Sequence, residues 1–303
     1  MMINISKALK NNRILKSLTG LSIEKFKELV PYFETILNEE NGKRIKRDKN
    51  RQRKAGGGSK PRLDSSESKL FYILFYVKVY PTFDLAGFIF DVNRSQTNRW
   101  MHKLLPILEK ALDRKLVLPK RKIENIGEFL KSFPEVKDLF IDGTERRVER
   151  SSDNKKQRLD YSGKKKAHTR KNLIVNDEKR RIILVTPTIK GSMHDKKIYD
   201  KYGLGNSIPS DVTQWVDTGF QGIQNEYDID VQIPKKNTKK RKLTFEEKEN
   251  NKIISGIRVI NEHAIGGIKR MKSISDVYRN KKANTDDKLM IVSAGIWNLF
   301  IAS

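Results

Sequence analysis

The spacing of apolar residues changes near residue 135, and this change limits the folds that the chain can adopt. Before it, apolar residues recur every three or four positions, as in residues 21–40, which predicts amphipathic helices. After it, they form short runs such as VKDLFID and RRIILVTPT, which are typical of buried β-strands. The sequence therefore predicts an all-α domain over residues 1–118 and an α/β domain with a mixed sheet over residues 119–303.

Two helices joined by a tight turn, over about residues 82–113, form the clearest motif of the first domain. TFDLAGFIF predicts a short helix, and the longer helix that follows can be capped by Asn93 or Ser95. This order is typical of a helix-turn-helix. The apolar side chains expected to pack between the two helices are Leu85, Ile89, Val92, Trp100 and Leu104.

The N-terminal end of the longer helix is expected to stay exposed and to face DNA. In a helix-turn-helix these positions meet base edges and phosphates. A helical hairpin with an ordinary polar face fits the local pattern equally well, and the net charge of the chain favours DNA. The residues concerned are Arg94, Gln96, Thr97 and Arg99.

The chain carries 63 lysine and arginine residues against 37 acidic residues, a formal charge of +26. A charge this large implies a polyanionic partner, most often nucleic acid, with an anionic membrane surface as the alternative. A solvated, lysine-rich surface would explain part of the excess, but the basic residues are clustered. The clusters are KRIKRDKNRQRK (43–54), KLVLPKRK (115–122), KKQR and SGKKKAHTRK (within 155–171) and KKNTKKRK (235–242). GGGSKPR (56–62) predicts a flexible loop.

Several absences exclude other classes of protein. The chain has no cysteine, which rules out disulfides, thiolate zinc sites and cysteine nucleophiles and suits a reducing cytoplasm. Its four histidines lack the paired spacing of a zinc site. No apolar run reaches the ~18 residues of a membrane span, and the N-terminus lacks the apolar region of a secretory signal. We therefore expect a cytoplasmic protein with neither a membrane nor a small-molecule partner.

Beyond residue 135 the predicted order is strand, hairpin, helix, strand, strand, helix. KNLIV and RRIILVTPT flank NDEKR, which predicts a β-hairpin. A short helix within GSMHDKKIYDKYG ends at Gly203. VTQWVD and YDIDVQIPKK predict two further strands, and a long helix is expected from Thr244 to about Met271. At the start of the short helix, His194 and Asp195 either assist a site at the strand ends or cap the helix.

Two aspartates stand in the same local setting. Asp142 follows Leu-Phe-Ile and Asp217 follows Trp-Val, and a glycine comes within two residues of each. If each aspartate ends a strand, the two carboxylates can converge beyond the sheet, where they would repel one another. Mg²⁺ or Mn²⁺ resolves that conflict, because these cations prefer carboxylate and water oxygens. The alternative is a pair of turn-forming aspartates, which a chain with 37 acidic residues can contain by chance.

The long helix carries a single carboxylate between cations. Arg258, Glu262 and Lys269 share one helical face, as a site that holds a metal and grips phosphates requires. An ordinary ion pair between Arg258 and Glu262, worth about 0.3–0.5 kcal/mol, is the alternative. The Gly266–Gly267 step costs about 1 kcal/mol per glycine, and we expect it to let the helix approach the sheet or a DNA backbone. The residues expected to pack on the sheet are Ile257, Ile260, Ala264, Ile268 and Met271.

Four stretches together carry a resemblance to a known family. The sequence resembles bacterial insertion-sequence transposases of the DDE superfamily, in the branch related to eukaryotic Harbinger elements. Arg258, Glu262 and Lys269 keep the spacing of the family's signature, while its tyrosine is Ser255 here and an expected proline is Arg147. The stretches are LFIDGTERRVERSSDNKKQRLDYSGKKKAHTRKNLIV, GSMHDKKIYD, WVDTGFQGI and IRVINEHAIGGIKRMK.

The resemblance implies an RNase H-like fold in which Asp142, Asp217 and Glu262 form the DDE triad. It implies two Mg²⁺ or Mn²⁺ ions about 3.5–4 Å apart, with Asp142 bridging both and the other two carboxylates each completing one. Water would then free a 3′-OH at the element's end, and this 3′-OH would attack target DNA. The short segment between Asp217 and Glu262 leaves no room for the large β-insertion found in some relatives of this fold.

The implied partner is double-stranded DNA, both element ends and target, at the nucleoid. Arg258 and Lys269 are expected to hold phosphates beside the scissile bond. SGKKKAHTRK is expected to form a basic hairpin against DNA, with a solvated turn as the alternative. Joining two ends in one event implies a homodimer. The hairpin residues concerned are Lys164, Lys165, Lys166 and Arg170.

Two other classes of function compete with this one. A domesticated or decayed derivative would bind DNA without cutting it, although keeping all three acidic residues in context speaks against decay. A basic RNA-binding protein would lack both the helix-turn-helix and the catalytic carboxylates, and would show aromatic residues on its strands that this sequence does not have.

Overall fold

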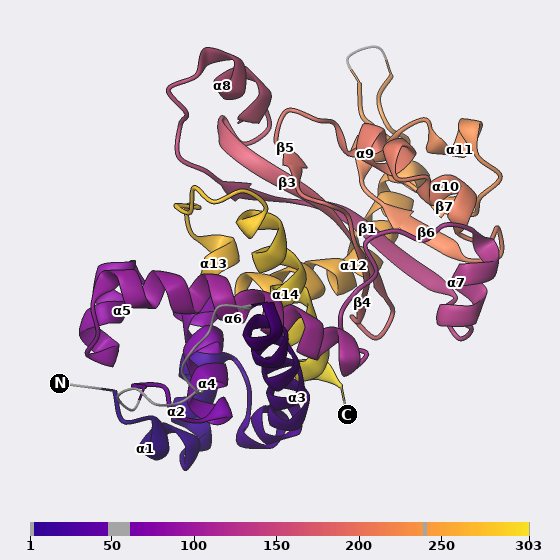
Figure 1. Ribbon diagram of the computed structural model, residues 1–303. Coiled ribbons are helices and arrows are strands. Elements are labelled where there is room, and N and C mark those ends of the chain that lie inside the picture. Colours follow the sequence, from indigo (N-terminus) through magenta and orange to yellow (C-terminus); the bar gives the residue numbers. More distant parts are fainter. Residues whose placement is uncertain (1–2, 48–60, 239–240, 303) are drawn as a thin grey trace. The chain divides into compact units, whose positions relative to one another are not determined.

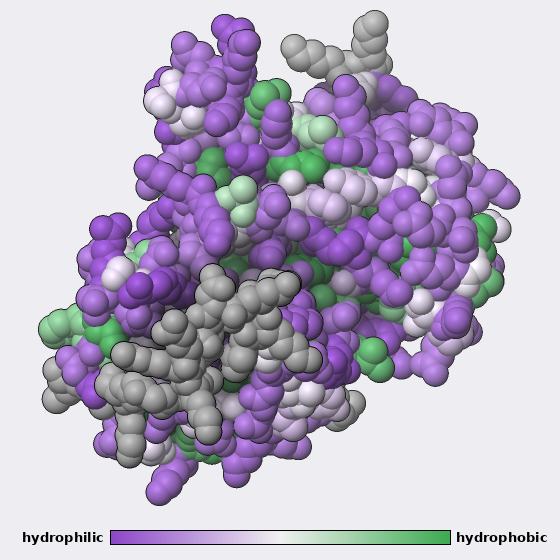
Figure 2. All heavy atoms as spheres, in the orientation of Figure 1, coloured by the Kyte–Doolittle hydropathy of each residue, from purple (hydrophilic) through white to green (hydrophobic). Residues whose placement is uncertain are grey.

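The computed structural model describes residues 3–47, 61–238 and 241–302. Residues 56–60 of the predicted loop and residues 48–54 of the basic cluster at 43–54 lie outside the described residues. Among the described helices, none has the length and apolar composition that crossing a membrane requires. The face of the molecule seen in Figure 2 is covered largely by hydrophilic side chains, in keeping with the composition.

The chain divides into two compact units, each described separately below (Figure 1). The first is all helical and the second contains the sheet, so the predicted fold class is confirmed. The first unit consists of Met1–Leu118, Arg270–Asp276 and Lys282–Ser303, and the second of Pro119–Lys269 and Val277–Lys281.

The helical unit is built around α4 (Ser66–Val79), which is apolar on all sides and almost wholly buried. The helix starts with a capping box: Ser65 Oγ accepts from the backbone N–H of Ser68, and Ser68 Oγ accepts from that of Ser65. The other helices of the unit are α1 (Ile5–Leu9), α2 (Asn12–Thr19), α3 (Ile23–Arg47), α5 (Phe83–Phe90), α6 (Arg94–Arg114), α13 (Lys272–Ser275) and α14 (Thr285–Ile301). Of these, α2, α3, α6 and α13 pack against α4.

The C-terminal helix α14 belongs to this helical unit, whereas the sequence placed it in the second domain. It is apolar on most of its surface and packs against α6. A Cβ on Gly295 would lie 3.1 Å from the side chains of both Leu112 and Leu118, and the Asn298 side chain donates to the carbonyl oxygen of Val117 (3.0 Å). A helix with so few polar positions needs burial on nearly every side, and α6 provides part of it.

The helices α5 and α6 form the predicted pair, but α5 is rotated relative to the expectation. Leu85 is 48% exposed, and the buried residues of α5 are Ala86, Gly87 and Phe90. Gly87 faces the turn, where a Cβ would lie 2.7 Å from the carbonyl oxygen of Val92. The close turn therefore requires Gly87, and not a large side chain such as that of Leu85, on its inner side.

Thr97 was expected at the DNA-facing surface, and this prediction is wrong. The side chain is fully buried, and its hydroxyl donates to the carbonyl oxygens of Phe83 (3.0 Å) and Arg94 (2.8 Å). Thr97 therefore ties the two helices together. Arg94 and Arg99 remain exposed, and Gln96 is half-buried.

The second unit holds a mixed sheet in the order β2-β3-β1-β6-β7, with β4 and β5 also paired to β3. β1 runs antiparallel to β3 and parallel to β6, and β6 runs parallel to β7. The predicted hairpin is present as β3 and β4. The strands are β1 (Asp138–Arg147), β2 (Tyr161–Ser162), β3 (Ala167–Asp177), β4 (Ile182–Val185), β5 (Ile189–Lys190), β6 (Thr213–Val216) and β7 (Val231–Gln232).

Asp142 does not end its strand as expected, because β1 continues through Gly143 to Arg147. From Leu139 to Arg147 it is paired with β3, and Gly143 itself lies opposite Leu173. A strand with a partner along its full length keeps its ladder through a single glycine. Asp142 therefore lies inside β1, while Asp217 follows the end of β6 as expected.

Helices lie on both sides of this sheet. Leu139 and Ile141 of β1 share a hydrophobic core with Ile198 and Tyr199 of α9 (Asp195–Lys201). Asp142, the next residue, points the other way and contacts α12 (Phe245–Lys269). The remaining elements are α7 (Ile126–Ser132), α8 (Asn154–Asp160), α10 (Leu204–Ser207), the 3₁₀ turn η1 (Thr218–Phe220) and α11 (Ile223–Glu226).

The helix α12 begins with a capping box and buries one side. Thr244 Oγ1 accepts from the backbone N–H of Glu247 (3.2 Å), and the Glu247 carboxylate accepts from that of Thr244 (3.1 Å). Of the predicted apolar stripe, Ala264 and Ile268 are buried within α12, Ile257 and Ile260 are half-buried, and Met271 lies beyond the helix.

Candidate active site

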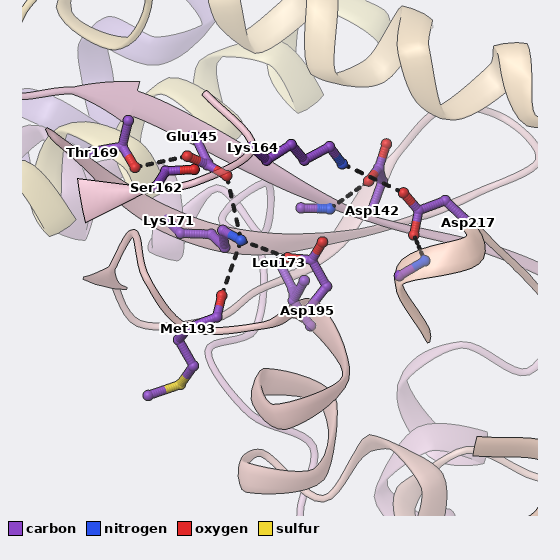
Figure 3. Close-up of polar contacts among 12 residues, drawn as sticks. Asp142, Glu145, Ser162, Lys164, Thr169, Lys171, Leu173, Met193, Asp195 and Asp217 are labelled. Atoms are coloured by element: carbon purple, nitrogen blue, oxygen red, sulfur yellow. Dashed lines mark hydrogen bonds and ion pairs between the residues drawn. The ribbon is translucent and has the colours of Figure 1, made fainter. Parts of the chain in front are cut away.

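The sheet brings Asp142 and Asp217 side by side. Ile141 of β1 is paired with Val216 of the parallel strand β6, so the two residues that follow lie next to each other. Each carboxylate accepts a backbone N–H nearby: Asp142 from Gly143 and Asp217 from Gly219, both at 2.7 Å. Figure 3 shows the two side chains meeting at this end of the β1–β6 pair.

A side-chain cation approaches each carboxylate. Arg258 of α12 lies 3.6 Å from Asp142 Oδ2, and Lys164 lies 3.6 Å from Asp217 Oδ2. Burial and the charge of Asp217 raise the pKa of Asp142 to about 6, against the opposing effect of Arg258. The Asp142–Asp217 pair is therefore electrostatically costly, and two positive side chains offset part of that cost.

Lys164 belongs to the predicted basic hairpin, which the structure contains. β2 and β3 pair across it, with Ser162 opposite Ala167. Burial acts to lower the pKa of Lys164, but the carboxylates of Asp217, Asp195 and Asp142 together raise it. Of the other hairpin cations, Lys165 and Lys166 are exposed, and Arg170 forms an ion pair with Asp160 (3.2 Å).

Glu262 lies apart from the pair. It follows Arg258 by one helical turn on α12, but its side chain is exposed, because Asn261, Ala264 and Ile265 occupy the buried face. Within residues 3–47, 61–238 and 241–302, no group of three or more His, Cys, Asp or Glu side chains is arranged to hold a metal ion. The structure thus brings together two of the three predicted carboxylates.

The other predicted residues of α12 are also placed. Lys269 is exposed. Desolvation of its ammonium group and the charge of Lys165 lower the pKa of Lys269, and the charge of Asp142 acts in the opposite direction. Lys269, Lys165 and Asp142 are therefore close enough to interact electrostatically. Gly266 is exposed, and a Cβ there would meet nothing within 4 Å. Close packing on the sheet therefore does not explain Gly266, and approach of a DNA backbone remains as the hypothesis.

The donor set fits a hard divalent cation. Two adjacent carboxylates, one of them with a raised pKa, are stabilised by nearby positive charge, and their oxygens are the ligands that Mg²⁺ and Mn²⁺ prefer. The cations at 3.6 Å show that this position already attracts positive charge.

Three charged residues behind the pair were missed or left open by the sequence. Glu145 and Lys171 lie directly opposite each other on β1 and β3, and Lys171 also reaches Asp195 at the start of α9. His194 occupies the cap position of α9, but its side chain makes no capping hydrogen bond. The alternation of side chains along both strands predicts that Glu145 and Lys171 face the core. Only the β1–β3 register shows that they lie opposite each other.

Comparison with known proteins agrees with this architecture. Residues 141–298 match the family described as DDE superfamily endonuclease, and residues 61–114 match the helix-turn-helix of DDE superfamily endonuclease. The chain belongs to the DDE superfamily endonucleases, and the prediction of a helix-turn-helix over α5 and α6 is confirmed.

A curated relative extends the match over nearly the whole chain. The chain is 28% identical over 290 residues, 96% of its own length and 95% of the relative's, to a protein of Microchaete diplosiphon described as "Probable transposase for insertion sequence element IS702". No solved structure matches the chain. The resemblance to insertion-sequence transposases is therefore confirmed.

Proposed function

We propose that this protein is a DNA transposase that cuts phosphodiesters at the ends of an insertion sequence and joins the freed ends to target DNA. The observation that carries the proposal is the Asp142–Asp217 pair, set side by side by the β1–β6 ladder in a chain of the DDE superfamily. The helix-turn-helix supports DNA as the partner, and the relationship to a probable transposase supports transposition over simple cleavage.

Asp142 and Asp217, with Glu262 from α12, are the residues that we assign to hold two Mg²⁺ or Mn²⁺ ions. Such ions supply activation of the attacking oxygen and stabilisation of the leaving oxygen in a phosphodiester displacement. The carboxylates of this chain supply the negative charge that would hold such ions at the place where the scissile phosphate enters.

The cations around the pair have a second task in this proposal. Arg258, Lys269 and the hairpin lysines neutralise the DNA backbone on either side of the scissile bond. In the first step a water oxygen bonds to phosphorus and the 3′ oxygen leaves as a free 3′-OH. In the second step that 3′-OH bonds to a target phosphorus and displaces a target 3′ oxygen, so no bond to the protein forms.

Two element ends must be joined in one event. We therefore infer that the protein acts on DNA as a homodimer, each copy contributing its own carboxylates.

The helix-turn-helix supplies a first prediction. Arg99→Ala is expected to weaken binding to the element ends about 10-fold and to reduce the salt dependence of binding by about one phosphate contact. Arg99 is exposed on α6, and its side chain hydrogen bonds locally, to Gln96 (3.1 Å). Fluorescence anisotropy across a salt series measures both effects.

The matched control for this prediction is Arg114→Ala. Arg114 lies at the other end of α6, where it pairs with Glu39 (2.9 Å). This variant should bind the ends as the wild type does. Equal losses in both variants would mean that binding depends on overall charge and not on the helix-turn-helix.

Cleavage tests the proposed function itself. Labelled DNA carrying the element ends, incubated with the full-length protein and Mg²⁺ or Mn²⁺, should acquire a nick with a 3′-OH and then join to target DNA. Chelation of the metal should stop both steps. Binding without cleavage, with metal and both ends present, would leave a non-catalytic DNA-binding protein.

Glu262→Gln tests the third carboxylate, which the structure leaves apart from the pair. We expect cleavage to fall at least about 100-fold, the scale of losing one electrostatic contact to the transition state, with end binding unchanged. Glu249→Gln is the control, because Glu249 lies on the same helix and pairs with Lys252, one turn along it (2.6 Å). Full activity of the Glu262 variant would remove Glu262 from the site.

A further inference from the structure

A buried network of charges lies behind the Asp142–Asp217 pair, on the opposite side of β1 from Arg258. Lys171 Nζ lies 3.0 Å from Asp195 Oδ1 and 3.3 Å from Glu145 Oε1, and donates to the carbonyl oxygen of Met193 (3.0 Å) (Figure 3). The three charged side chains are less than 10% exposed. Thr169 completes the network by donating its hydroxyl to Glu145 (2.7 Å).

Such a network is a poor way to gain stability alone. Burying each ion costs several kcal/mol, and well-packed apolar residues of the same volume are often as stable or more so. What the charges do provide is a fixed position for the start of α9, which carries Asp195. Lys171 of β3 joins Glu145 of β1 to Asp195, the first residue of α9, and its bond to the Met193 carbonyl oxygen ties the chain just before α9 to the same point of the sheet.

Asp195 is held against the two glycines that accompany the catalytic aspartates. A Cβ on Gly143 would lie 2.6 Å from Asp195 Oδ1, and a Cβ on Gly219 would lie 3.3 Å from Asp195 Oδ2 and 2.8 Å from Asp217 Oδ1. Gly143 follows Asp142 directly, and the amide of Gly219 is bonded to Asp217. The Asp195 carboxylate thus lies against both segments of chain that carry the pair, at Gly143 and at Gly219.

Backbone conformation does not explain these glycines. Neither has a positive φ, unlike Gly20, Gly203 and Gly222, so any residue could adopt their backbone angles. At Gly143 the Asp195 carboxylate takes the space of a side chain, and at Gly219 the Asp217 carboxylate takes most of it, with Asp195 as the next neighbour.

We propose that Asp195, fixed by Lys171 and Glu145, is a positioning residue for the catalytic carboxylates. It sets the separation between the Asp142 and Asp217 segments, and so the affinity of the pair for divalent cations. This role rests on the proposed function, since it assumes that the pair holds Mg²⁺ or Mn²⁺. Partners that orient metal ligands have effects of about 10- to 100-fold on metal affinity or activity.

The test measures Mn²⁺ binding to the full-length Asp195→Asn variant by electron paramagnetic resonance, without DNA. The dissociation constant should rise about 10- to 100-fold, with the number of ions per chain and the affinity for element ends unchanged. Asp177→Asn is the matched control: Asp177 is also buried and also forms an ion pair, with Arg181 (2.9 Å), but lies in the β3–β4 hairpin. It should lose thermal stability and keep wild-type Mn²⁺ affinity.

A second variant covers the case in which Asp195→Asn does not fold. Gly143→Ala, which keeps Asp195, should weaken Mn²⁺ binding about 10-fold by displacing the Asp195 carboxylate, and unchanged Mn²⁺ affinity in this variant would overturn the positioning role. Where Asp195→Ala folds, Gly143→Ala should add no further loss in that background, because its methyl group has room there. Additive losses would show that the contact is not the cause.

Three results separate the possible failures. Unchanged Mn²⁺ affinity in a folded Asp195→Asn protein would overturn the positioning role alone and leave the proposed function standing. Loss of one ion per chain would make Asp195 a metal ligand, which also overturns the positioning role. A wild-type protein that binds no Mn²⁺ would overturn the proposed function, and the positioning role with it.

Discussion

Replacing Asp142 by asparagine is expected to reduce DNA cleavage at least about 1000-fold while leaving binding of the element ends within about twofold. A factor of 1000 corresponds to about 4 kcal/mol of transition-state stabilisation, which single electrostatic contacts reach in active sites. Asparagine keeps the shape and can still accept the Gly143 N–H, so only the charge beside Asp217 is removed. Nicking of labelled ends measures cleavage, and a gel shift measures binding.

Asp138→Asn is the control for this variant. Asp138 begins the same strand and accepts a hydrogen bond from the Trp215 indole (2.7 Å), which asparagine can also accept. It should cut at the wild-type rate. If Asp142→Asn retains more than about a tenth of the activity, the Asp142–Asp217 pair is not the catalytic centre.

The approach of the two aspartates could be predicted from the sequence because it depends on local pattern. Each follows a short apolar run, and parallel neighbours in a sheet bring such positions together. The exact place of Asp142 within its strand could not be predicted, because whether β1 stops at Gly143 depends on how far its partner strand β3 extends. β3 pairs with β1 as far as Arg147, and nothing in the β1 sequence records that length.

The errors in the helical unit have the same origin. Thr97 is polar and lies one turn into a helix, so its sequence position predicts exposure. Its burial follows from the crossing of α5 over α6, which offers the Phe83 carbonyl oxygen as a partner. Leu85 turns outward because the close turn admits only Gly87 at its inner side.

The Lys171 network shows a third kind of limit. Glu145, Lys171 and Asp195 are far apart in sequence and unremarkable one by one. Strand alternation places the first two toward the core, where a charge without a partner would be costly. Only the β1–β3 register and the position of α9 reveal that Lys171 is the partner of both carboxylates.

The Asp142→Asn substitution is also expected to stabilise the metal-free fold at neutral pH, by up to about 3 kcal/mol. Burial and Asp217 raise the pKa of Asp142 from 3.8 to about 6, so the folded protein binds this proton more tightly than the unfolded chain does. Below about pH 4 the carboxyl group is protonated in both states and costs nothing. As the pH rises from about 4 to about 6, the wild type loses stability, because Asp142 ionises in the unfolded chain first. Above about pH 6 the full free-energy cost of the ionised Asp142 in the fold is present. Asparagine stays neutral and never incurs this cost.

Urea unfolding in the presence of a chelator, at pH 4 and pH 7.5, measures this difference. The variant should exceed the wild type at pH 7.5 and match it at pH 4. A variant that is less stable at pH 7.5 would show that the ion pair with Arg258 outweighs the repulsion from Asp217. The expected result, an inactive protein that is more stable, would mean that the fold holds two carboxylates together at the expense of its own stability, as a site that recruits divalent cations requires.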